Sequence, residues 1–467
     1  MKKLFTLIVL ALGLLVSAIG FAACGGNNDN NGINDDAKIK TSETSDFVFE
    51  ESGNGYAVKS YIGTDSTVKI PSTYNGKFVY IISSKAFSYC LQVERIIVPE
   101  SVIEIEDDAF YYCTSLKILT LPSSIQKMSS SAFCSTDAIE TANIDSKLVS
   151  YIPNSNVKTL NIISGETLNI PYLNKLEKIT ICETITLIST NSYLTCNEFS
   201  VSEQNTVYKS VDGNLYSKDG ETLVKYATGK TATQFTISDS VTSIGDYAFY
   251  NCSSLTSITI PDSVTDIRGY AFYNCSSLTS IYYTGTASEW ASKIDGLGNI
   301  MSSGRTLYIN NEPVTNVVLE NVTVIKSYAF SYCSSLTSIT IPDSVTSIGD
   351  GAFRGCSSLT SITIPDSVTS IEGQAFYGCS GLTSITIPDS VTSIGDYAFH
   401  GCSSLTSITI PDGVTSIGRW AFEYCSSLTS ITFNGTKTQW YAIRGDWTYN
   451  IPSSCKVHCT DGDVDIW

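Results

Sequence analysis

The feature that most constrains this chain is a unit of 23 residues that repeats along its C-terminal part. Between Ser331 and Ser430 nearly the same sequence, CSSLTSITIPDSVTSIGDYAF, occurs four times with small changes. The same spacing separates a series of cysteines and a series of Ala-Phe pairs: Cys333, Cys356, Cys379, Cys402 and Cys425, and Phe330, Phe353, Phe376, Phe399 and Phe422. A repeat of this length predicts a solenoid, in which each unit buries its core only against its neighbours.

Within one repeat, the apolar residues alternate as they do in a β-strand. In the run LTSITIP the two isoleucines should point inward and the Ser and Thr beside them outward, because successive side chains of a strand lie on opposite faces. The inward positions are Ile339 and Ile341, and the outward ones are Ser338 and Thr340. The remaining interior positions are expected at Val345, Ile348, Ala352 and Phe353.

The repeated cysteine is expected to be a buried free thiol, because a buried Cys packs as a small apolar residue with a weak donor. Neighbouring rungs, about 4.8 Å apart, are within disulfide distance. Identical side chains on stacked rungs nevertheless point the same way and cannot easily reach the torsion of a disulfide. Cys455 and Cys459 are a different case, since they can form a local disulfide or remain two packed thiols. A zinc site there would need two more ligands, and only His458 is near.

The repeats are bounded by caps and interrupted twice. Turn dipeptides such as Asn75-Gly76 and Asp212-Gly213 separate short strand-like runs outside the repeats. A short helix is expected over Ala287–Ile294, and its Gly285 and Trp290 recur at Gly435 and Trp440. We predict a signal peptide over 1–23, a disordered tether over 24–45, an N-terminal β cap over 46–82, partly degenerate repeats over 83–204, a β-meander insertion over 205–231, repeats over 232–283, an insertion over 284–313, repeats over 314–433 and a C-terminal cap over 434–467.

The N-terminus has the pattern of an export signal. Lys2 and Lys3 precede an apolar run that ends in small residues just before Cys24. This arrangement resembles the lipobox of bacterial lipoproteins, which implies that Cys24 is diacylated and becomes the new N-terminus. The alternatives are an ordinary cleaved signal peptide and a retained anchor helix. The following residues, rich in Gly, Asn, Asp and Ser, cannot bury enough apolar surface to fold, which favours a tether.

Charge and composition disfavour several classes of function. The formal net charge of −17 opposes binding to nucleic acid and to anionic membrane surfaces. The chain has two histidines and no phosphate loop or hydrolase motif, so no enzyme activity or cofactor is predicted. A row of Asp residues, one per repeat, can hold divalent cations or cap turns, and turn capping is favoured. An outward Thr row occurs in some ice-binding proteins, but it also stabilises a sheet without any ligand.

The repeat unit LxxIxIPxxVTxIGxxAFxxCxx resembles the BspA-like class of leucine-rich repeats. The resemblance covers Asp46 to Trp467 and is most specific over Ser240–Tyr283 and Ser331–Ser430. It implies a mainly β fold, a right-handed leucine-rich-repeat solenoid with a parallel β-sheet on the concave face and with β-hairpin caps and insertions. It also implies a cell-surface protein linked to adhesion, to host matrix proteins or to other microbes.

Specificity is expected where the outward strand positions depart from the Ser/Thr pattern. These candidate ligand residues are Arg95, Ile97, Ile118, Asn143, Lys178, Tyr282, Asn316 and Val318. We therefore expect a monomer, held by a lipid at the extracellular face of the cell membrane, that binds a host extracellular or microbial surface protein or glycan. The alternatives are a structural spacer with no dedicated ligand and, as a third class, a glycan-processing enzyme.

Overall fold

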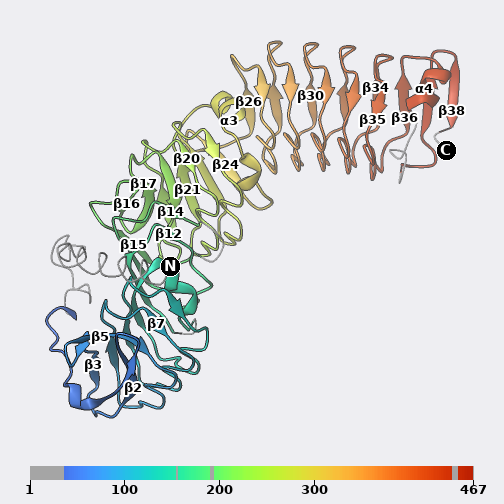
Figure 1. The fold of residues 1–467 in the computed structure, drawn as a ribbon. Helices are drawn as coiled ribbons and strands as arrows, with labels where there is room; N and C mark the ends of the chain where they lie inside the picture. Colours follow the sequence, from blue (N-terminus) through green and yellow to red (C-terminus); the bar gives the residue numbers. More distant parts are fainter. Residues whose placement is uncertain (1–35, 154–155, 190–193, 444–450, 466–467) are drawn as a thin grey trace, which may run out of the picture. The chain divides into compact units, whose positions relative to one another are not determined.

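The computed structural model describes residues 36–153, 156–189, 194–443 and 451–465. The chain divides into two compact units, which meet in sequence between Asp219 and Gly220. Each unit is a stack of β rungs, as the ribbon in Figure 1 shows, and this confirms the predicted mainly β leucine-rich-repeat solenoid.

The main sheet of the first unit has seven strands, all parallel, in the order β15-β13-β11-β10-β8-β6-β3. Its strands are β3 (Thr67–Lys69), β6 (Arg95–Ile97), β8 (Ile118–Thr120), β10 (Thr141–Asp145), β11 (Thr159–Ser164), β13 (Lys178–Ile181) and β15 (Glu198–Val201). The strands pair in register, so equivalent residues of successive rungs lie side by side. Outward residues therefore form continuous columns along this face.

The first unit carries a second group of strands, which pair outside its main sheet. They are β1 (Phe47–Ser52), β2 (Gly55–Tyr61), β4 (Thr73–Tyr74), β5 (Lys77–Ile82), β7 (Glu104–Ile105), β9 (Lys127–Met128), β12 (Thr167–Leu168) and β14 (Leu187–Ile188). The strands β1 and β2 form an antiparallel hairpin, as do β4 and β5 around Asn75-Gly76. Because β5 also pairs in parallel with β2 and β7, the N-terminal hairpins continue directly into the solenoid.

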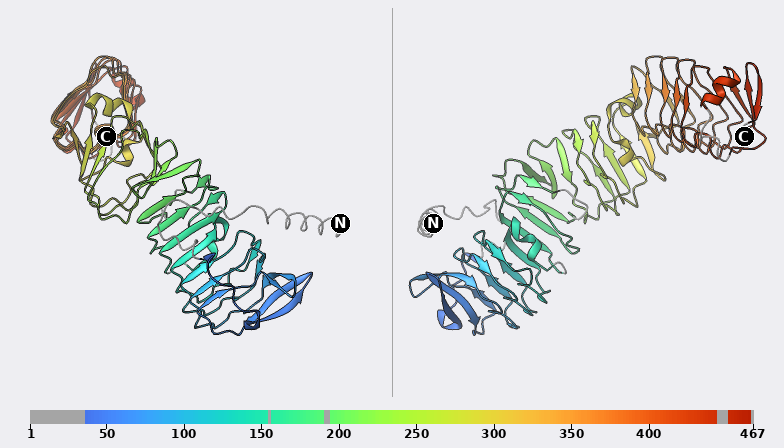
Figure 2. Two further views of the ribbon diagram at one scale, coloured as in Figure 1. Left: turned by 90° about the vertical axis from the view of Figure 1, so that its left-hand side faces the viewer. Right: turned by 45° about the vertical axis from the view of Figure 1, so that its right-hand side comes forward.

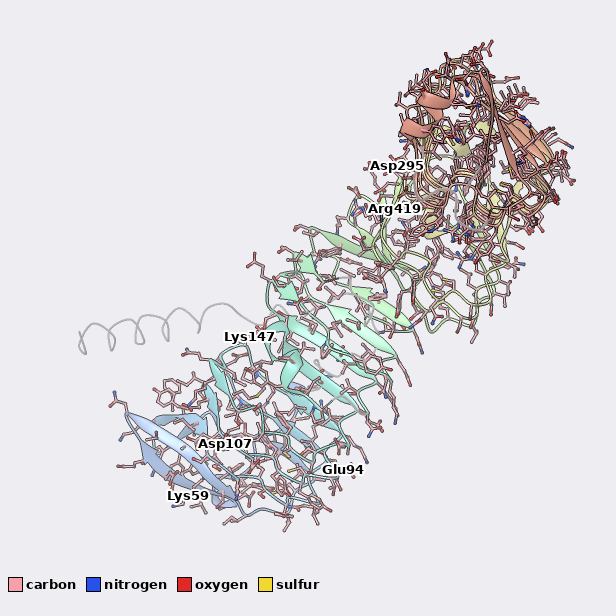
Figure 3. The ribbon with its side chains drawn as sticks, turned by 90° about the vertical axis from the view of Figure 1, so that its right-hand side faces the viewer. Lys59, Glu94, Asp107, Lys147, Asp295 and Arg419 are labelled. Carbon is pink, nitrogen blue, oxygen red and sulfur yellow. The ribbon has the colours of Figure 1, made fainter. Side chains whose placement is uncertain are left out.

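Other elements of the first unit are the short helices η1 (Thr44–Asp46) and η2 (Ser146–Tyr151) and the hairpin of β16 (Tyr208–Val211) and β17 (Asn214–Ser217). Exposed ion pairs connect neighbouring rungs, and one of their members, Glu94, is labelled in Figure 3. They are Lys117–Glu94, Lys127–Glu104, Lys158–Glu140 and Lys178–Glu198. Such exposed pairs contribute little to stability, about 0–1 kcal/mol each.

The second unit begins with β18 (Thr222–Lys225) and builds its main sheets from longer strands. They are β19 (Gln234–Thr236), β21 (Ser257–Ile260), β23 (Ser280–Tyr283), β24 (Thr306–Ile309), β25 (Glu312–Pro313), β26 (Asn316–Val318), β28 (Ser338–Thr340), β30 (Ser361–Thr363), β32 (Ser384–Thr386), β34 (Ser407–Ile410), β36 (Ser430–Phe433), β37 (Lys456–Cys459) and β38 (Gly462–Asp465). Figure 2 shows the later strands as successive rungs between α3 and α4.

Two-residue strands form the other side of the second unit. They are β20 (Ser243–Ile244), β22 (Asp266–Ile267), β27 (Val324–Ile325), β29 (Ser347–Ile348), β31 (Ser370–Ile371), β33 (Ser393–Ile394) and β35 (Ser416–Ile417). Turn serines connect these rungs, since Ser344 Oγ donates to Val322 O at 2.7 Å and Ser390 Oγ to Val368 O at 2.6 Å.

The core of each repeat is filled as the alternation predicts. Ile339, Ile341, Val345, Ile348, Ala352 and Phe353 are all buried, whereas Ser338 and Thr340 are exposed. The phenylalanine rings form a stacked column, with Phe376 and Phe399 only 5° from parallel and their centroids 5.4 Å apart. Stacked pairs of this kind contribute about 0.5–1.5 kcal/mol beyond the area that they bury.

The repeated cysteines are free thiols, as expected, and Cys356, Cys379, Cys402 and Cys425 each bond to the rung before. Cys356 Sγ donates to Phe330 O at 3.0 Å, and Cys379 Sγ to Phe353 O at 3.1 Å. At the same position of the first unit, Thr136 Oγ1 donates to Phe110 O at 2.5 Å. Because a hydroxyl can replace the thiol, the position of the repeated cysteine in each rung is defined by its hydrogen bond as well as by its apolar surroundings.

The insertion of the second unit contains α3 (Ala287–Lys293), which confirms the predicted helix, and η3 (Leu297–Asn299). Thr286 and Glu289 form a capping box at its start. Trp290 is fully buried, and its Nε1 donates to Ala329 O at 2.7 Å. The second copy of this segment forms α4 (Lys437–Ile443), where Trp440 is buried against Phe433.

Candidate binding face

The structure divides the eight candidate ligand residues between the two units. Arg95, Ile97, Ile118, Asn143 and Lys178 lie on four strands of the seven-stranded sheet, β6, β8, β10 and β13, whereas Tyr282, Asn316 and Val318 belong to the second unit. We name the outward side of the seven-stranded sheet the polar face. Its main column runs through residues in register: Lys69, Ile97, Thr120, Asn143, Asn161, Thr180 and Ser200.

The first rungs of the polar face are covered by residues Asp36–Ser42, which we name the N-terminal strap. The Lys69 ammonium donates to Asp36 O and Ile39 O, both at 3.0 Å. Ser42 N donates to Lys69 O at 3.0 Å, and Lys69 N donates to Ser42 Oγ at 3.1 Å. The disordered tether predicted through residue 45 is therefore wrong for the strap, which is held by polar contacts that an argument from apolar burial does not count.

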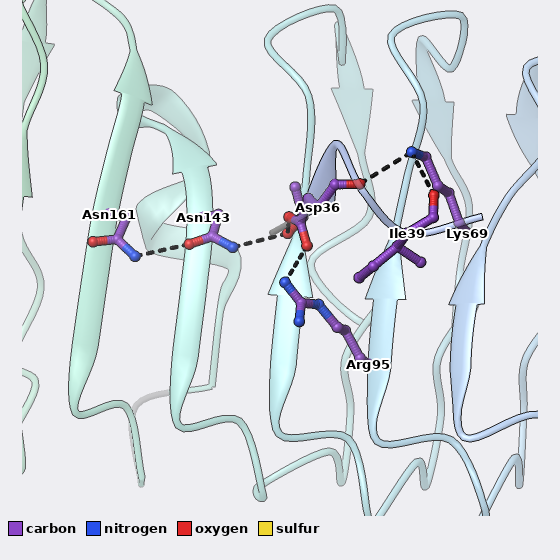
Figure 4. Close-up of polar contacts among 7 residues, drawn as sticks. Asp36, Ile39, Lys69, Arg95, Asn143 and Asn161 are labelled. Carbon is purple, nitrogen blue, oxygen red and sulfur yellow. Dashed lines mark hydrogen bonds and ion pairs between the residues drawn. The ribbon is translucent and has the colours of Figure 1, made fainter. Parts of the chain in front are cut away.

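The strap carries a carboxylate that is almost buried on the polar face. Asp36 forms an ion pair with Arg95, and the two side chains are only 11% and 17% exposed, respectively. Thr120 Oγ1 donates to Asp36 Oδ2 at 2.6 Å. Figure 4 shows Asp36 with its partners on neighbouring strands. Hydrogen bonds to ionised groups are stronger than neutral ones, so this is the most strongly polar contact of the strap.

Behind Thr120, a ladder of side-chain hydrogen bonds runs across two further rungs. Asn143 Nδ2 donates to Thr120 Oγ1 at 2.9 Å, and Asn161 Nδ2 donates to Asn143 Oδ1 at 2.8 Å. All donors point toward Asp36, so each bond polarises the next and strengthens the hydroxyl that reaches the carboxylate. At the far end, Asn161 Oδ1 and Thr180 Oγ1 are buried without a hydrogen-bond partner.

Two predicted ligand residues are therefore not open to a partner. Ile97 is 6% exposed and Asn143 is fully buried, although both occupy outward strand positions. The alternation assigned their face correctly, but an outward residue is exposed only where nothing covers the sheet. The strap contacts the rungs on both sides of Ile97, and the amide of Asn143 is used within the ladder.

The remaining predicted residues of the first unit are more accessible. Ile118 is half-buried on β8. Lys178 is 30% exposed and pairs with Glu198 at 2.7 Å, at the far end of the same sheet. Arg95 and Lys178 therefore bring positive charge to the polar face of an acidic chain.

In the second unit the predicted residues lie on separate sheets. Tyr282 of β23 stacks on Tyr308 of β24, with centroids 4.7 Å apart. Asn316 is exposed and accepts a hydrogen bond from Ser338 Oγ at 2.7 Å, and Val318 is 62% exposed. These residues form no shared polar network of the kind that joins Arg95 to Asn161.

Sequence reasoning missed four residues of this arrangement, namely Asp36, Lys69, Thr120 and Asn161. The last three can be recognised by aligning the strands, because each stands in the column of Ile97 and Asn143. Asp36 cannot be found in this way, since it lies 59 residues from Arg95 and 84 from Thr120.

The two cysteine predictions have different outcomes. Cys455 and Cys459 are unbonded thiols, so the local disulfide is not formed. Cys455 directly precedes the strand β37 and Cys459 is its last residue, and four residues of strand span about 13 Å, which exceeds the Cα separation of a disulfide. Cys24, the predicted lipid attachment site, lies outside the described residues.

The second unit has a hollow of about 540 Å³. Its one charged lining residue is Arg354, whose Nη1 donates to Gln374 Oε1 at 2.8 Å. The guanidinium also lies over the rings of Tyr332 and Tyr377. Tyr377 in turn stacks on His400, which is paired with Glu423 and is largely buried. This cluster is largely occupied with contacts inside the chain.

Comparison with known proteins gives a family match. A family model described as "BspA type Leucine rich repeat region" matches residues 80–200, 225–323 and 323–443, in six copies. No curated protein matches the chain significantly. In the described ranges, no helix combines the length and the apolar character that a membrane crossing needs.

Several solved structures are similar. A leucine rich cell surface protein from Faecalibacterium prausnitzii A2-165 shares 27% identity over 87% of this chain and 97% of its own, with a TM-score of 0.36. A leucine-rich repeat protein from Bacteroides ovatus ATCC 8483 shares 23% identity over 83% and 98%, with a TM-score of 0.43. Because both TM-scores are low, nothing about function is taken from these likenesses.

Proposed function

The chain belongs to the BspA-type leucine-rich repeat family, and from this premise we propose that it is a non-catalytic binding protein of the cell surface. Its partner would be a host extracellular or microbial surface protein or glycan, as in an adhesin. The observation that carries the proposal is the polar face of the first unit. There a cation and a hydroxyl contact a peptide segment that is not a strand of the sheet, and an amide ladder bonds to that hydroxyl from behind.

The proposal assigns different roles to the two units. The Thr residues just before the strands of the clean repeats bond to the rung before, as when Thr383 Oγ1 donates to Thr360 O at 3.2 Å. Their hydroxyls therefore serve the stack itself, which supports a spacer role for the repeats from Ser331 onward. The proposal therefore assigns the specificity for the partner to the irregular rungs of the first unit.

Binding by the polar face is testable with charge variants. The full chain would be titrated against matrix proteins, surface glycans and intact bacterial cells. We expect saturable binding to at least one of them, and at least a tenfold loss when Arg95→Met and Lys178→Ala are combined, because two cations of the face are removed. Lys326→Ala is the matched control, since Lys326 forms an exposed ion pair with Asp295 in the second unit. No saturable binding to any ligand, with the fold retained, would favour a spacer protein instead.

The proposed lipid anchor at Cys24 predicts a change of location. Cys24→Ser should release the protein into the medium or leave the precursor unprocessed, because no thiol remains for acylation. Cell fractionation and incorporation of a labelled fatty acid measure this. Cys134→Ser is the control, because Cys134 is an exposed free thiol. Membrane retention of the Cys24→Ser variant, together with a wild-type protein that takes up no lipid label, would contradict the anchor.

A further inference from the structure

The strap occupies the polar face in the way that a bound peptide would. It passes over β3, the edge strand of the seven-stranded sheet, and both main-chain groups of Lys69 bond to Ser42. The Lys69 ammonium bonds to two main-chain carbonyl oxygens of the strap, which any peptide can offer. The contacts of the Lys69 ammonium are therefore independent of the side chains of the segment that lies there, whereas the bond of Lys69 N uses the Ser42 hydroxyl.

One contact of the strap depends on a charged side chain. The carboxylate of Asp36 receives hydrogen bonds from the Arg95 guanidinium and the Thr120 hydroxyl. Neither Arg95 nor Asp36 is well exposed, so a neutral residue in place of Asp36 would remove a carboxylate that pairs with a nearly buried guanidinium, which costs free energy. The Asn143–Asn161 ladder fixes the Thr120 hydroxyl as a donor, because Thr120 Oγ1 already accepts from Asn143. The site thus selects an acceptor that carries negative charge.

We propose that Lys69, Arg95 and Thr120 form a binding site for an extended peptide segment that carries a carboxylate, and that Asp36 of the strap fills this site until a partner displaces it. This inference rests on the proposed binding function and names the class of partner for the polar face. The strap and the partner compete for the same three side chains, so the strap sets a threshold for binding. A tethered segment has an effective concentration of about millimolar. An acidic peptide that binds weakly and without specificity therefore does not displace the strap.

The test uses the full chain and a capped, fluorescent peptide with the strap sequence, DAKIKTSE (residues 36–43). Fluorescence anisotropy measures its affinity for the wild type and for Asp36→Asn. We expect Asp36→Asn to bind the peptide at least tenfold more tightly, because its own strap no longer supplies the carboxylate. Peptide NAKIKTSE should bind at least tenfold more weakly than DAKIKTSE, and adding Arg95→Met to Asp36→Asn should remove the preference for Asp.

A matched control and a second measurement separate the site from general charge effects. Glu198→Gln breaks the Lys178–Glu198 pair at the far end of the same face and should leave peptide affinity at the wild-type value. Hydrogen exchange of the main-chain amides of Ser42 and Lys69 should accelerate in Asp36→Asn, since both amides bond across the strap contact.

The proposal is overturned if wild type and Asp36→Asn bind the peptide equally, if the Asn peptide binds as well as the Asp peptide, or if Arg95→Met changes nothing. Binding of an acidic sugar such as glucuronate, with no binding of the peptide, would also overturn it. None of these measurements requires a surface ligand. Peptide binding without binding to any cell or matrix protein would therefore refute the surface-binding function alone, and the reverse result would refute only the acidic-peptide site.

Discussion

Replacing Asn205 with Ala is expected to destabilise the first unit by about 4 kcal/mol. Asn205 is fully buried where the repeat pattern breaks, and its side chain makes four hydrogen bonds to the main chain. Nδ2 donates to Cys182 O and Ile185 O, both at 2.8 Å, and Oδ1 accepts from Val207 N at 2.9 Å and Tyr208 N at 2.7 Å. Each bond contributes about 1 kcal/mol net, and each unpaired buried group adds a cost.

The effect of Asn205→Ala should be local, because a solenoid rung contacts only its neighbours. Denaturant unfolding combined with hydrogen exchange over residues 180–210 would detect it, while the transition of the second unit stays unchanged. Asn156→Ala is the control within the same unit, since its two side-chain bonds are exposed and should cost less than about 1 kcal/mol. Equal destabilisation by both variants, or an equal shift in both units, would contradict the role assigned to Asn205.

Asn205 illustrates what a repeat pattern can and cannot predict. The 23-residue spacing places Ile339, Ala352 and Phe353 in the core, because periodicity and strand alternation determine which residues face inward. The loss of the pattern at Asn205 predicts an insertion. The pattern says nothing of the four main-chain groups that Asn205 satisfies, since these depend on how the chain turns in space.

The candidate site was less predictable than the repeat core, because its contacts also depend on how distant parts of the chain meet in space. Arg95 and Lys178 lie on the outward face as the alternation indicates. Ile97 and Asn143 share that face, yet they are buried, because burial depends on a segment that approaches from far along the chain. The strap is polar, so composition predicted disorder. Its ordering comes from a few directed contacts of Asp36 and Ser42, which composition does not encode.

Strongly alkaline pH is expected to unfold the clean repeats of the second unit, and the cysteine column is the cause. Burial raises the pKa of Cys333, Cys379 and Cys425 to about 12, and it raises the pKa of Cys356 and Cys402 well above the ordinary value. In the unfolded chain these thiols ionise near pH 9. Above that pH the folded state therefore binds more protons than the unfolded state, and stability falls as pH rises toward 12.

The size of this alkaline effect follows from the number of thiols. Each thiol that stays protonated in the fold costs about 1.4 kcal/mol of stability per pH unit above pH 9, and five such thiols act on one stack of rungs. Below pH 9 both states keep their protons, so the effect is absent there. Circular dichroism of the full chain at stepwise pH, with thiolate absorbance recorded in parallel, should show unfolding and ionisation together between pH 9 and 12.

The matched control replaces all five cysteines with Ser, which does not ionise in this range. Thr136 shows that a hydroxyl can make the same bond to the Phe carbonyl of the rung before, so the serine variant should fold. Tyr and Lys titrate alike in both proteins, and any difference in alkaline stability then belongs to the thiols. If the two proteins lose their structure at the same pH, or if the thiols of the folded wild type ionise near pH 9, the cysteine column does not limit alkaline stability.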